Sequence, residues 1–407
     1  MRILHTSDWH LGKSLAGFSR AAEHEAFLDE VVAHAQDADL VVLAGDVFDT
    51  YNPPIEAEEL FYDTMARLGD GGRRGVVVIA GNHDSPDRLA APGPLTASHG
   101  VFILGRPGDR TRPNGHRSAV GRVALLEPQP SVLELALPCG QTAVVAAVPY
   151  PSESRLQTLL SHSLEDRDLQ SAYQEHLARV FSELAKSFRP DTVNIATSHL
   201  AIRSCMPSES ERALVGGAYQ IAGSALPASA QYIALGHLHR AQAVDDAPTT
   251  TRYCGAPLAF RMSEREYERT HCLVEIEPGQ PAKVELVPID AGRPLVIWDV
   301  DGLDEVLRGV DDGLYTDAFI ELRVNANRYL DHSELATLRK LPRDFVRIRS
   351  VLPEAAELPA DRAERRNLPA SELFRAFFRE TVEEEPEQAL VDLFVELTDA
   401  ALSAGSA

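Results

Sequence analysis

Five short segments of this chain end in side chains that can bind metal ions. An isolated Asp-x-His is common by chance, but five such segments in a fixed order form a specific signal. Their imidazole and carboxylate groups suit Mn²⁺, Fe or Zn²⁺ better than Mg²⁺, which prefers oxygen ligands alone. Thiolates are absent from them, which argues against a structural zinc site. The segments are Asp8-Trp9-His10, Gly45-Asp46-Val47-Phe48-Asp49, Gly81-Asn82-His83-Asp84, Thr197-Ser198-His199 and Gly236-His237-Leu238-His239.

The chemistry that fits these residues is hydrolysis of a phosphodiester by two divalent ions. The reaction needs an activated water and neutralisation of the charge on the phosphoryl oxygens, and two ions about 3.5–4 Å apart provide both. Asp46 follows an apolar run and a glycine, so its carboxylate is placed to bridge two ions. His237 and His239 lie two residues apart, which in extended backbone points both imidazoles the same way. Asn82 offers a neutral carbonyl oxygen.

A catalytic acid is predicted beside these ligands. His83 adjoins Asn82 and is not needed as a ligand, so we expect it to protonate the leaving oxygen, with Asp84 as its orienting partner. Asp49 is predicted to accept a hydrogen bond rather than to bind a metal. The remaining histidines have no ligand-spaced partner and are predicted to be structural or solvated: His5, His24, His34, His99, His116, His162, His176, His271 and His332.

The elements that must position these residues follow from the apolar runs that precede them. Strands alternate with helical stretches at 23–36 and 55–68, which is typical of an α/β fold. The continuously apolar runs at 41–43 and 76–79 indicate strands covered on both faces. Open α/β sheets place their sites at the carboxyl ends of strands, where the five segments lie. Predicted strands span 2–6, 40–44, 76–80, 101–104, 142–148, 193–197 and 232–235, then 295–298, 319–325 and 345–351, with helices at 303–308 and 332–340 between the last three.

Six longer stretches surround the metal motifs: SDWHLGK at 7–13, EHEAFL at 23–28, GDVFDT at 45–50, GNHDSP at 81–86, YIALGHLHR at 232–240 and YCGAPL at 253–258. With these stretches the chain resembles the calcineurin-like metallophosphoesterases, and within them the SbcD family of bacterial nuclease subunits. The resemblance implies an α/β fold, a four-layer αββα sandwich with a small α/β cap domain and a C-terminal helix pair. It implies a nuclease domain at 1–287, a cap or DNA-binding accessory domain at 288–352, a linker at 353–368 and a helical partner-binding segment at 369–407.

The resemblance also implies the roles of the site residues. One ion is held by Asp8, His10, Asp46 and His239, and the other by Asp46, Asn82, His199 and His237, with His83 as catalytic acid. The expected cofactors are two Mn²⁺ per chain, although other divalent ions can be accommodated. The expected activity is exonucleolytic on double-stranded DNA ends and endonucleolytic on single strands and hairpins. The expected partner is SbcC, a coiled-coil ATPase, in a heterotetramer built on a homodimer that acts in DNA recombination, repair and replication-fork processing.

Two other functions compete with this interpretation. A phosphatase or cyclic-nucleotide phosphodiesterase could use the same metal core. Protein phosphatases of this superfamily usually have Asp-Arg-Gly and Gly-Asn-His-Glu, whereas this chain has Asp49-Thr50-Tyr51 and Asn82-His83-Asp84. The other alternative is a non-catalytic scaffold, but every ligand position is filled and His83 is present.

Contact with DNA must be reconciled with an acidic chain. The net charge is −22, of which the tail from 354 to 407 contributes −8, with 13 acidic and 5 basic residues. Arginines gather between 105 and 122, a stretch with several Pro and Gly residues and a local charge of +4. We expect Arg110, Arg112 and Arg117 to contact DNA phosphates, for which arginine is suited by its bidentate geometry. A solvated loop is the competing interpretation.

The end of the chain has an amphipathic pattern. Aromatic residues recur in it, although they make up only 6% of the chain. Such a stripe fits helix-in-groove docking onto a partner, while packing onto the chain's own domains is the alternative. The aromatic residues expected to bind the partner are Phe374, Phe377, Phe378 and Phe394.

The resemblance implies a bacterial, nucleoid-associated protein, and the composition agrees with a cytoplasmic location. No apolar run approaches the roughly 20 residues of a transmembrane helix, so no membrane association is expected. The four cysteines are scattered without a C-x-x-C pair, which favours free thiols in a reducing compartment.

Overall fold

A computed structural model gives the fold of this chain. It describes residues 1–112, 120–152, 166–208 and 220–352, together with residues 371, 372, 374, 375, 378, 386, 388, 390, 391 and 393–395. The chain separates into two compact units. The first comprises Met1–Trp298, Gly309–Leu322 and Leu341–Arg347, and the second comprises Asp299–Arg308, Arg323–Lys340 and the described residues from Ile348 onward. The predicted domain boundaries at 287 and 352 stay predictions.

Two large sheets form the first unit. The six-stranded sheet has the order β15-β14-β1-β2-β3-β4, and its strands β1 to β4 are parallel. The seven-stranded sheet has the order β12-β13-β11-β8-β7-β6-β5, with β13, β11, β8 and β7 parallel. The six strands are β1 Arg2–Thr6, β2 Leu40–Leu43, β3 Gly75–Ile79, β4 Val101–Leu104, β14 Thr270–Glu275 and β15 Lys283–Pro288. The seven are β5 Ala124–Gln129, β6 Val132–Ala136, β7 Thr142–Val148, β8 Val193–His199, β11 Tyr232–Gly236, β12 Gln242–Ala243 and β13 Thr251–Tyr253.

Helices and short strands complete this unit. A two-stranded sheet pairs β9 with β10. The helices are α1 Ala21–His34, α2 Ile55–Gly69, α3 Pro86–Ala90, α4 Gly93–Thr96 and α5 Asp166–Leu184, with strands β9 Ala201–Ile202 and β10 Gln220–Ile221. The 3-10 helices are η1 Asp70–Gly72, η2 Ala97–His99, η3 Ala185–Ser187, η5 Gly223–Ala225 and η6 Met262–Glu264. Among the described helices, none is long and apolar enough to cross a membrane.

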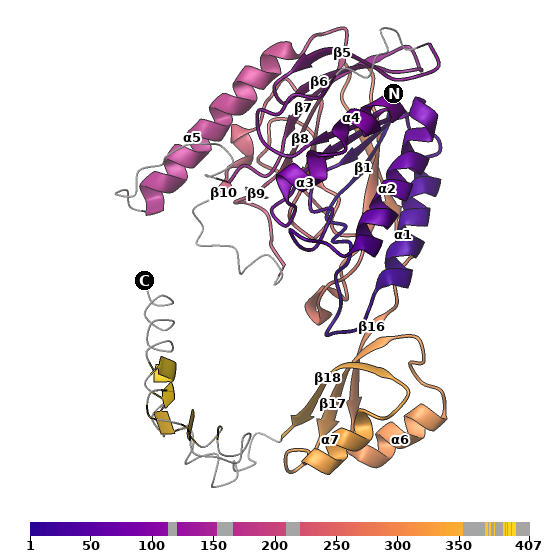
Figure 1. Ribbon diagram of the computed structural model, residues 1–407, viewed down its shortest axis with the longest axis vertical. Coiled ribbons are helices and arrows are strands. Elements are labelled where there is room, and N and C mark those ends of the chain that lie inside the picture. The colour runs from indigo at the N-terminus through magenta and orange to yellow at the C-terminus, as the bar shows by residue number, and fades with distance from the viewer. Residues whose placement is uncertain are drawn as a thin grey trace. The chain divides into compact units, whose positions relative to one another are not determined.

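Three clusters of buried side chains define four layers. The first cluster joins α1 and α2 to one face of the six-stranded sheet, for example through Phe27, Phe61 and Val41. The second fills the space between the two sheets, and the third joins α5 to the outer face of the seven-stranded sheet through Tyr173 and Phe181. Figure 1 shows α1 and α2 on one side of the strands and α5 on the other. The layers are therefore helix, sheet, sheet and helix, which confirms the predicted αββα sandwich.

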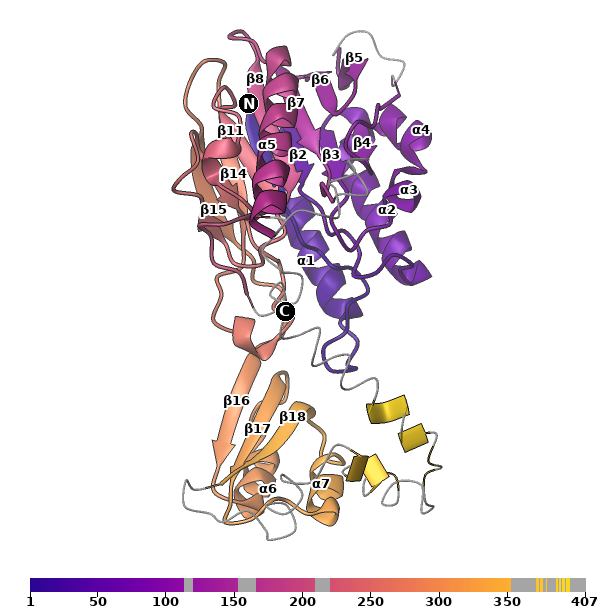
Figure 2. The same cartoon turned by 90° about the vertical axis from the view of Figure 1, so that its left-hand side faces the viewer.

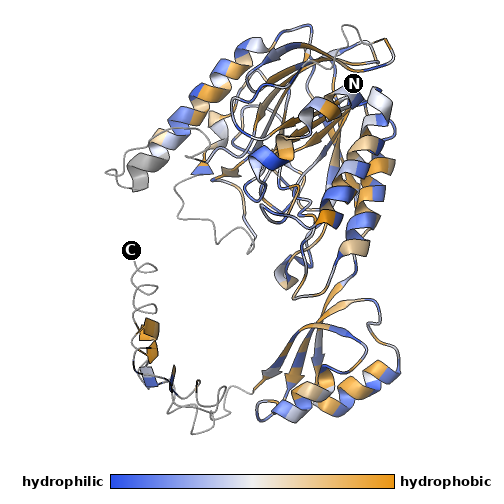
Figure 3. Ribbon diagram, viewed as in Figure 1, coloured by the Kyte–Doolittle hydropathy of each residue, from blue (hydrophilic) through white to orange (hydrophobic). Residues whose placement is uncertain are grey.

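The apolar runs owe their length to this double coverage. Side chains alternate between the faces of a strand. In β2, Val41 and Leu43 face the helices, whereas Leu40 and Val42 face the other sheet. All four are buried, so no position on this strand tolerates a polar residue. Helices α1 and α2, by contrast, each carry hydrophobic and hydrophilic residues on different faces (Figure 3).

The predicted elements of this unit agree with the structure to within a few residues, but some were missed. Strands β14 and β15 extend the first sheet as an antiparallel pair beside β1. Their sequences mix polar and apolar residues because β15 is only partly buried, so no continuous apolar run marks them. Helix α5 was also missed, although Tyr173, Leu177 and Phe181 recur every four residues on its buried face. That spacing was the available signal.

Residues 295–351 contain a three-stranded sheet of order β16-β17-β18 with helices α6 and α7 (Figure 2). Its strands confirm the three predicted beyond residue 288. Helix α7 begins with a capping box, in which the carboxylate of Asp331 accepts from the Glu334 N–H. The elements are β16 Leu295–Val300, α6 Leu303–Asp311, β17 Phe319–Asn325, α7 His332–Leu338 and β18 Asp344–Val351.

Aromatic residues near the end of the chain pack on one another. The rings of Phe374 and Phe394 stack with centroids 4.4 Å apart, and Phe378 lies 5.9 Å from Phe374. Leu390 and Leu393 are 39% and 50% exposed. The described residues of 371–378 and 388–395 are helical, in keeping with the predicted helix pair. Phe377 lies outside the described residues.

Candidate metal centre

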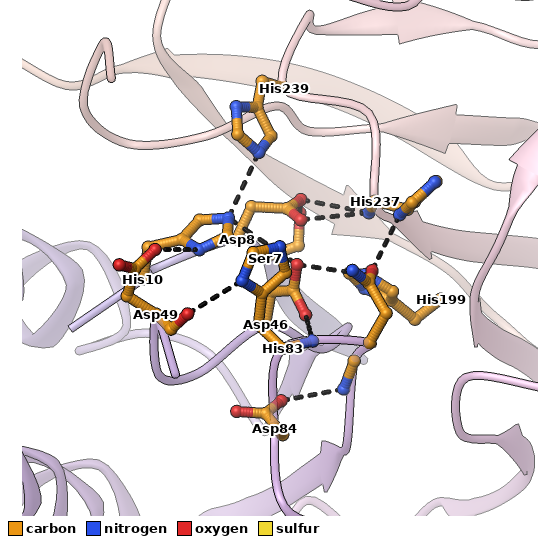
Figure 4. Close-up of polar contacts among 12 residues, drawn as sticks. Ser7, Asp8, His10, Asp46, Asp49, His83, Asp84, His199, His237 and His239 are labelled. Carbon is orange, nitrogen blue, oxygen red and sulfur yellow. Dashed lines mark hydrogen bonds and ion pairs between the residues drawn. The ribbon is translucent and has the colours of Figure 1, made fainter. Parts of the chain in front are cut away.

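The predicted ligands lie where the central strands of both large sheets end. Asp8 and His10 follow β1, Asp46 follows β2 and Asn82 follows β3. His199 is the last residue of β8 and pairs in register with Gly236, directly before His237. Figure 4 shows the labelled ligands among them, Asp8, His10, Asp46, His199, His237 and His239, gathered at one place. The carboxyl ends of parallel strands thus bring together residues that are up to 231 positions apart in sequence, from Asp8 to His239.

The backbone at this point adopts an unusual conformation. Asp8, His10, Asp46 and His237 have positive φ angles of 55°, 45°, 49° and 102°. Non-glycine residues seldom adopt such angles, and those that do gather at functional sites. Hydrogen bonds between the loops hold this geometry: Asp8 N–H donates to the Gly45 carbonyl at 3.0 Å, and His10 N–H to the Asp46 carbonyl at 3.0 Å.

Two glycines permit the loops to approach one another. A Cβ on Gly81 would lie 2.0 Å from Oδ1 of Asp46, and a Cβ on Gly236 would lie 2.0 Å from the carbonyl oxygen of Ala44. Both contacts are far inside van der Waals distance, so any side chain would push the ligand-bearing loops apart. The glycines that precede Asn82 and His237 are therefore part of the site.

His10 and His239 form one half of the centre. Their Nε2 atoms face each other at 3.1 Å. Nδ1 of His10 lies 3.4 Å from the Asp49 carboxylate, and Nδ1 of His239 lies 3.4 Å from the carboxylate of Glu264. A neutral imidazole carries hydrogen on only one nitrogen, so in the tautomers whose Nδ1–H groups face these carboxylates each Nε2 has a lone pair. Two lone pairs facing at this distance repel unless a cation lies between or beside them.

His199, His237 and Asn82 form the other half. Nδ1 of His199 donates to the Ala44 carbonyl at 2.8 Å, so Nε2 is the nitrogen that offers a lone pair to a cation once it is deprotonated. That Nε2 atom lies 3.0 Å from Oδ1 of Asn82, and Nδ1 of His237 lies 3.0 Å from the same oxygen. Electron-pair donors therefore converge here as well, which is the arrangement that a divalent cation needs.

Asp46 connects the two halves. Its Oδ2 atom lies 3.6 Å from Nε2 of His10 and 3.4 Å from Nε2 of His199. Its Oδ1 atom accepts the N–H of His83 at 2.9 Å. Asp8 completes the set and is held in place because its carboxylate accepts the N–H of His237 at 3.0 Å. A carboxylate that reaches both halves is the geometry of a bridging ligand.

The pKa values of the proposed ligands are shifted as expected for a buried site without a bound cation. Burial raises the pKa of Asp8 and lowers the pKa of His10 to about 4 and of His237 to about 3. Burial opposes the charged form of Asp46 too, but the neighbouring His199 and His10 lower its pKa well below 3.8. Burial also acts against the charge on His199, yet the Asp46 carboxylate raises the pKa of that imidazole to about 9. The donor set therefore fits a divalent cation, whose charge would take the place of this proton.

His83 lies beside the proposed ligands, but Asp84 is not placed as predicted. The His83 ring lies against that of His10, and its Nδ1 atom donates to the carbonyl oxygen of Asp49 at 2.8 Å. The carboxylate of Asp84 turns away and accepts the N–H groups of Val47, Phe48 and Gly81 at 3.1, 2.9 and 2.8 Å. The prediction that Asp84 orients the His83 ring is thus corrected, because these backbone donors draw the Asp84 carboxylate beneath the loops. Burial, followed by the charge of Asp46, raises the pKa of Asp84 to about 6.

Several other predicted residues are not among the seven proposed ligands. Asp49 adjoins the centre, where its carboxylate accepts from Lys13 at 2.5 Å and lies near His10 and His83. His5 is buried and bonds to the Tyr232 hydroxyl and the Leu235 carbonyl, so it is structural. Arg110 and Arg112 are exposed and line a surface cavity of about 230 Å³. Arg117 lies outside the described residues. Sequence reasoning missed Glu264, which no metal motif marks.

Comparison with known proteins agrees with this fold and site. The profile of the calcineurin-like phosphoesterase family matches residues 1–241. The SbcD subunit of the nuclease SbcCD from Bacillus subtilis is 39% identical over 98% of this chain and 97% of its own length. The corresponding protein of Rhodobacter capsulatus is 32% identical over 76% of this chain and 75% of its own. That of Escherichia coli K12 is 32% identical over 74% and 71%.

The chain therefore belongs to the calcineurin-like phosphoesterases and, among them, to the SbcD family of SbcCD nuclease subunits. Membership of this class makes it a metal-dependent phosphoester hydrolase. The family profile ends at residue 241, so the segment that contains Glu264 lies beyond it.

Proposed function

We propose that this protein is a Mn²⁺-dependent DNA nuclease that acts with a coiled-coil ATPase of the SbcC type. It degrades double-stranded DNA ends exonucleolytically, cuts single strands and hairpins endonucleolytically, and serves recombination, repair and replication-fork processing. The observation that carries the proposal is the convergence of seven donor residues, with Asp46 between the other six. The relatives named as nucleases of the SbcCD complex support DNA as the substrate.

The proposed ligands divide between two ions. Asp8, His10, Asp46 and His239 hold one, while Asp46, Asn82, His199 and His237 hold the other. The 3.6 and 3.4 Å distances from Asp46 to the two halves support its role as the bridge. The mixture of imidazole, carboxylate and amide donors supports Mn²⁺ over Mg²⁺.

The proposed mechanism assigns the remaining proton transfer to His83. Two bound ions would activate a water and neutralise charge on the phosphoryl group. The Asp49 carbonyl fixes the His83 ring through Nδ1–H, which leaves Nε2 to act on the substrate. In the imidazolium form of the ring, Nε2 also carries a proton, and this is the proton proposed to pass to the leaving oxygen. His83 is also partly exposed, whereas His10 beside it is buried, so His83 can reach a substrate. Asp84 fixes the loops that carry Asp46 and Asn82 and does not meet the substrate.

The surfaces for DNA and for the partner are also proposals. Arg110, Arg112 and Arg117 contact DNA phosphates, and Phe374, Phe377, Phe378 and Phe394 belong to the segment at 369–407 that binds SbcC. The exposed Leu390 and Leu393 in that segment support an apolar docking face. A homodimer of this chain then joins SbcC in a heterotetramer, in the cytoplasm.

The test is cleavage by the purified chain with Mn²⁺. End-labelled duplex and hairpin DNA and p-nitrophenyl phosphate are offered in parallel to the wild type, to Asp46→Ala and to His83→Ala. We expect DNA cleavage by the wild type alone. Hydrolysis of the small ester without DNA cleavage, even after SbcC and ATP are added, would favour the alternative of a phosphatase or cyclic-nucleotide phosphodiesterase.

A further inference from the structure

Glu264 is a buried carboxylate beside the metal centre. It is the last residue of η6, and its side chain is 1% exposed. A carboxylate is seldom placed in such surroundings unless it is hydrogen-bonded, since burial of an unpaired charge is strongly unfavourable. The groups around it therefore indicate what it does.

Three groups from separate segments meet this carboxylate. Oε1 lies 3.4 Å from Nδ1 of His239 and accepts the Ser208 hydroxyl at 2.9 Å. Oε2 accepts the backbone N–H of Phe260 at 2.7 Å. Glu264 thus binds a predicted metal ligand with one oxygen and fixes a neighbouring loop with the other.

The Phe260 contact extends this support to His10. The ring of Phe260 packs edge-on against His10, with centroids 5.0 Å apart, and against His239, with centroids 5.5 Å apart. Since Glu264 holds the backbone of Phe260, it helps to keep the two imidazoles with their Nε2 atoms 3.1 Å apart.

We propose that Glu264 is the positioning residue of the His10–His239 half of the centre. It accepts the Nδ1–H of His239, fixes the ring in the tautomer whose Nε2 lone pair faces the ion, and increases the basicity of that nitrogen. Carboxylate partners of metal-bound histidines act in this way in other proteins. The other half has no such partner in the contacts described, since His199 is oriented by a backbone carbonyl. The inference rests on the proposed metal site and adds a residue beyond the 241 positions of the family profile.

The test is a calorimetric titration of metal-free protein with Mn²⁺. Wild type is expected to bind two ions. Glu264→Gln retains the size of the side chain, and we expect it to weaken one of the two sites about 10- to 100-fold and to leave the other unchanged. Glu134→Gln on β6 is the matched control, because it removes an ion pair with Arg189 and should leave both affinities unchanged. If Glu264→Gln does not fold, Glu264→Asp replaces it in the titration, since it keeps the charge but withdraws it from His239. The same selective weakening of one site is expected.

A double-mutant comparison separates positioning from a general structural role. If Glu264 acts through His239, Glu264→Gln has little further effect on Mn²⁺ binding when His239→Ala is already present. Equal weakening in both backgrounds, or unchanged affinities in Glu264→Gln, would overturn the inference and leave the proposed function intact. Failure of the wild type to bind Mn²⁺ would overturn the proposed function and this inference together.

Discussion

The buried histidines of two regions of this molecule behave differently. In the metal centre, ring nitrogens of His10, His199 and His239 face other electron-pair donors at 3.0–3.1 Å. Among the strands of the six-stranded sheet, His5 bonds to ordinary polar partners, and neither ring nitrogen of His271 has a hydrogen-bond partner among the described residues. Burial is complete or nearly so in both regions. What marks a ligand is therefore the convergence of donors and not burial itself.

Substitutions in the two regions should also have different effects on metal binding and on stability. The centre crowds lone pairs, carboxylates and left-handed backbone into one place, all of which cost stability in the absence of a cation. Substitutions there should change metal binding more than the stability of the metal-free protein. Substitutions at His271 should do the reverse.

The largest effect is expected from Asp46→Asn. Because this carboxylate reaches both halves of the centre, its loss should abolish tight binding of both Mn²⁺ ions and reduce cleavage by several orders of magnitude. Calorimetry with Mn²⁺ checks the binding, and thermal unfolding in chelator should show a Tm close to that of the wild type. Retention of one tightly bound ion would contradict the bridging role.

Gly81→Ala should have an effect nearly as large without altering any ligand. The added Cβ would meet the Asp46 carboxylate at 2.0 Å and displace it or the Asn82 loop. We expect Mn²⁺ affinity to fall at least 10-fold, because both affected groups are proposed ligands. Gly93→Ala serves as the control, since a Cβ there meets nothing within 4 Å. Equal Mn²⁺ affinities for the two variants would show that the close approach is not needed.

His83→Gln should separate catalysis from binding. The ring is proposed to donate a proton and not to bind an ion, so both Mn²⁺ affinities should stay within a few-fold of the wild type. Cleavage should fall roughly 10²- to 10⁴-fold, the usual contribution of a general acid. Single-turnover cleavage at saturating Mn²⁺ measures this. A large loss of metal affinity would instead make His83 a ligand.

The smallest effect is expected from substitution of His271, which lies outside the centre and should change stability but not metal binding. Burial, followed by the charges of His34 and His5, lowers its pKa from 6.5 to about 3. The folded state therefore excludes a proton that the unfolded chain binds, so stability is retained above pH 6.5 and lost as the pH falls toward 3. By pH 5 this histidine accounts for about 2 kcal/mol of that loss. In urea unfolding, the free energy of unfolding should fall less between pH 8 and pH 5 for His271→Leu than for the wild type. Mn²⁺ binding at pH 8 should be unchanged. Identical pH dependence would refute this.

The sequence predicted those parts of the molecule that depend on local patterns. The apolar runs of strands such as β2 and β3 predicted the α/β pattern, and the polar residues after the strands predicted a metal site at their carboxyl ends. The four layers and the assignment of seven ligands to two ions came from the family resemblance. Glu264 could not be found in this way, because it lies in a short polar turn and meets His239 only through tertiary packing. The contacts of Asp84 were missed for the same reason, since its backbone donors Val47 and Phe48 belong to another loop. The left-handed backbone of Asp8 and Asp46 has no sequence signal apart from Gly45 and Gly81, whose role as spacers emerges only from the folded loops.

The most direct test of the two-metal centre is the anomalous scattering of crystals grown with Mn²⁺. We expect two peaks in each chain, about 3.5–4 Å apart, on either side of the Asp46 carboxylate. One should lie beside His10 and His239, and the other beside Asn82, His199 and His237. A single peak, or peaks away from these residues, would contradict the account.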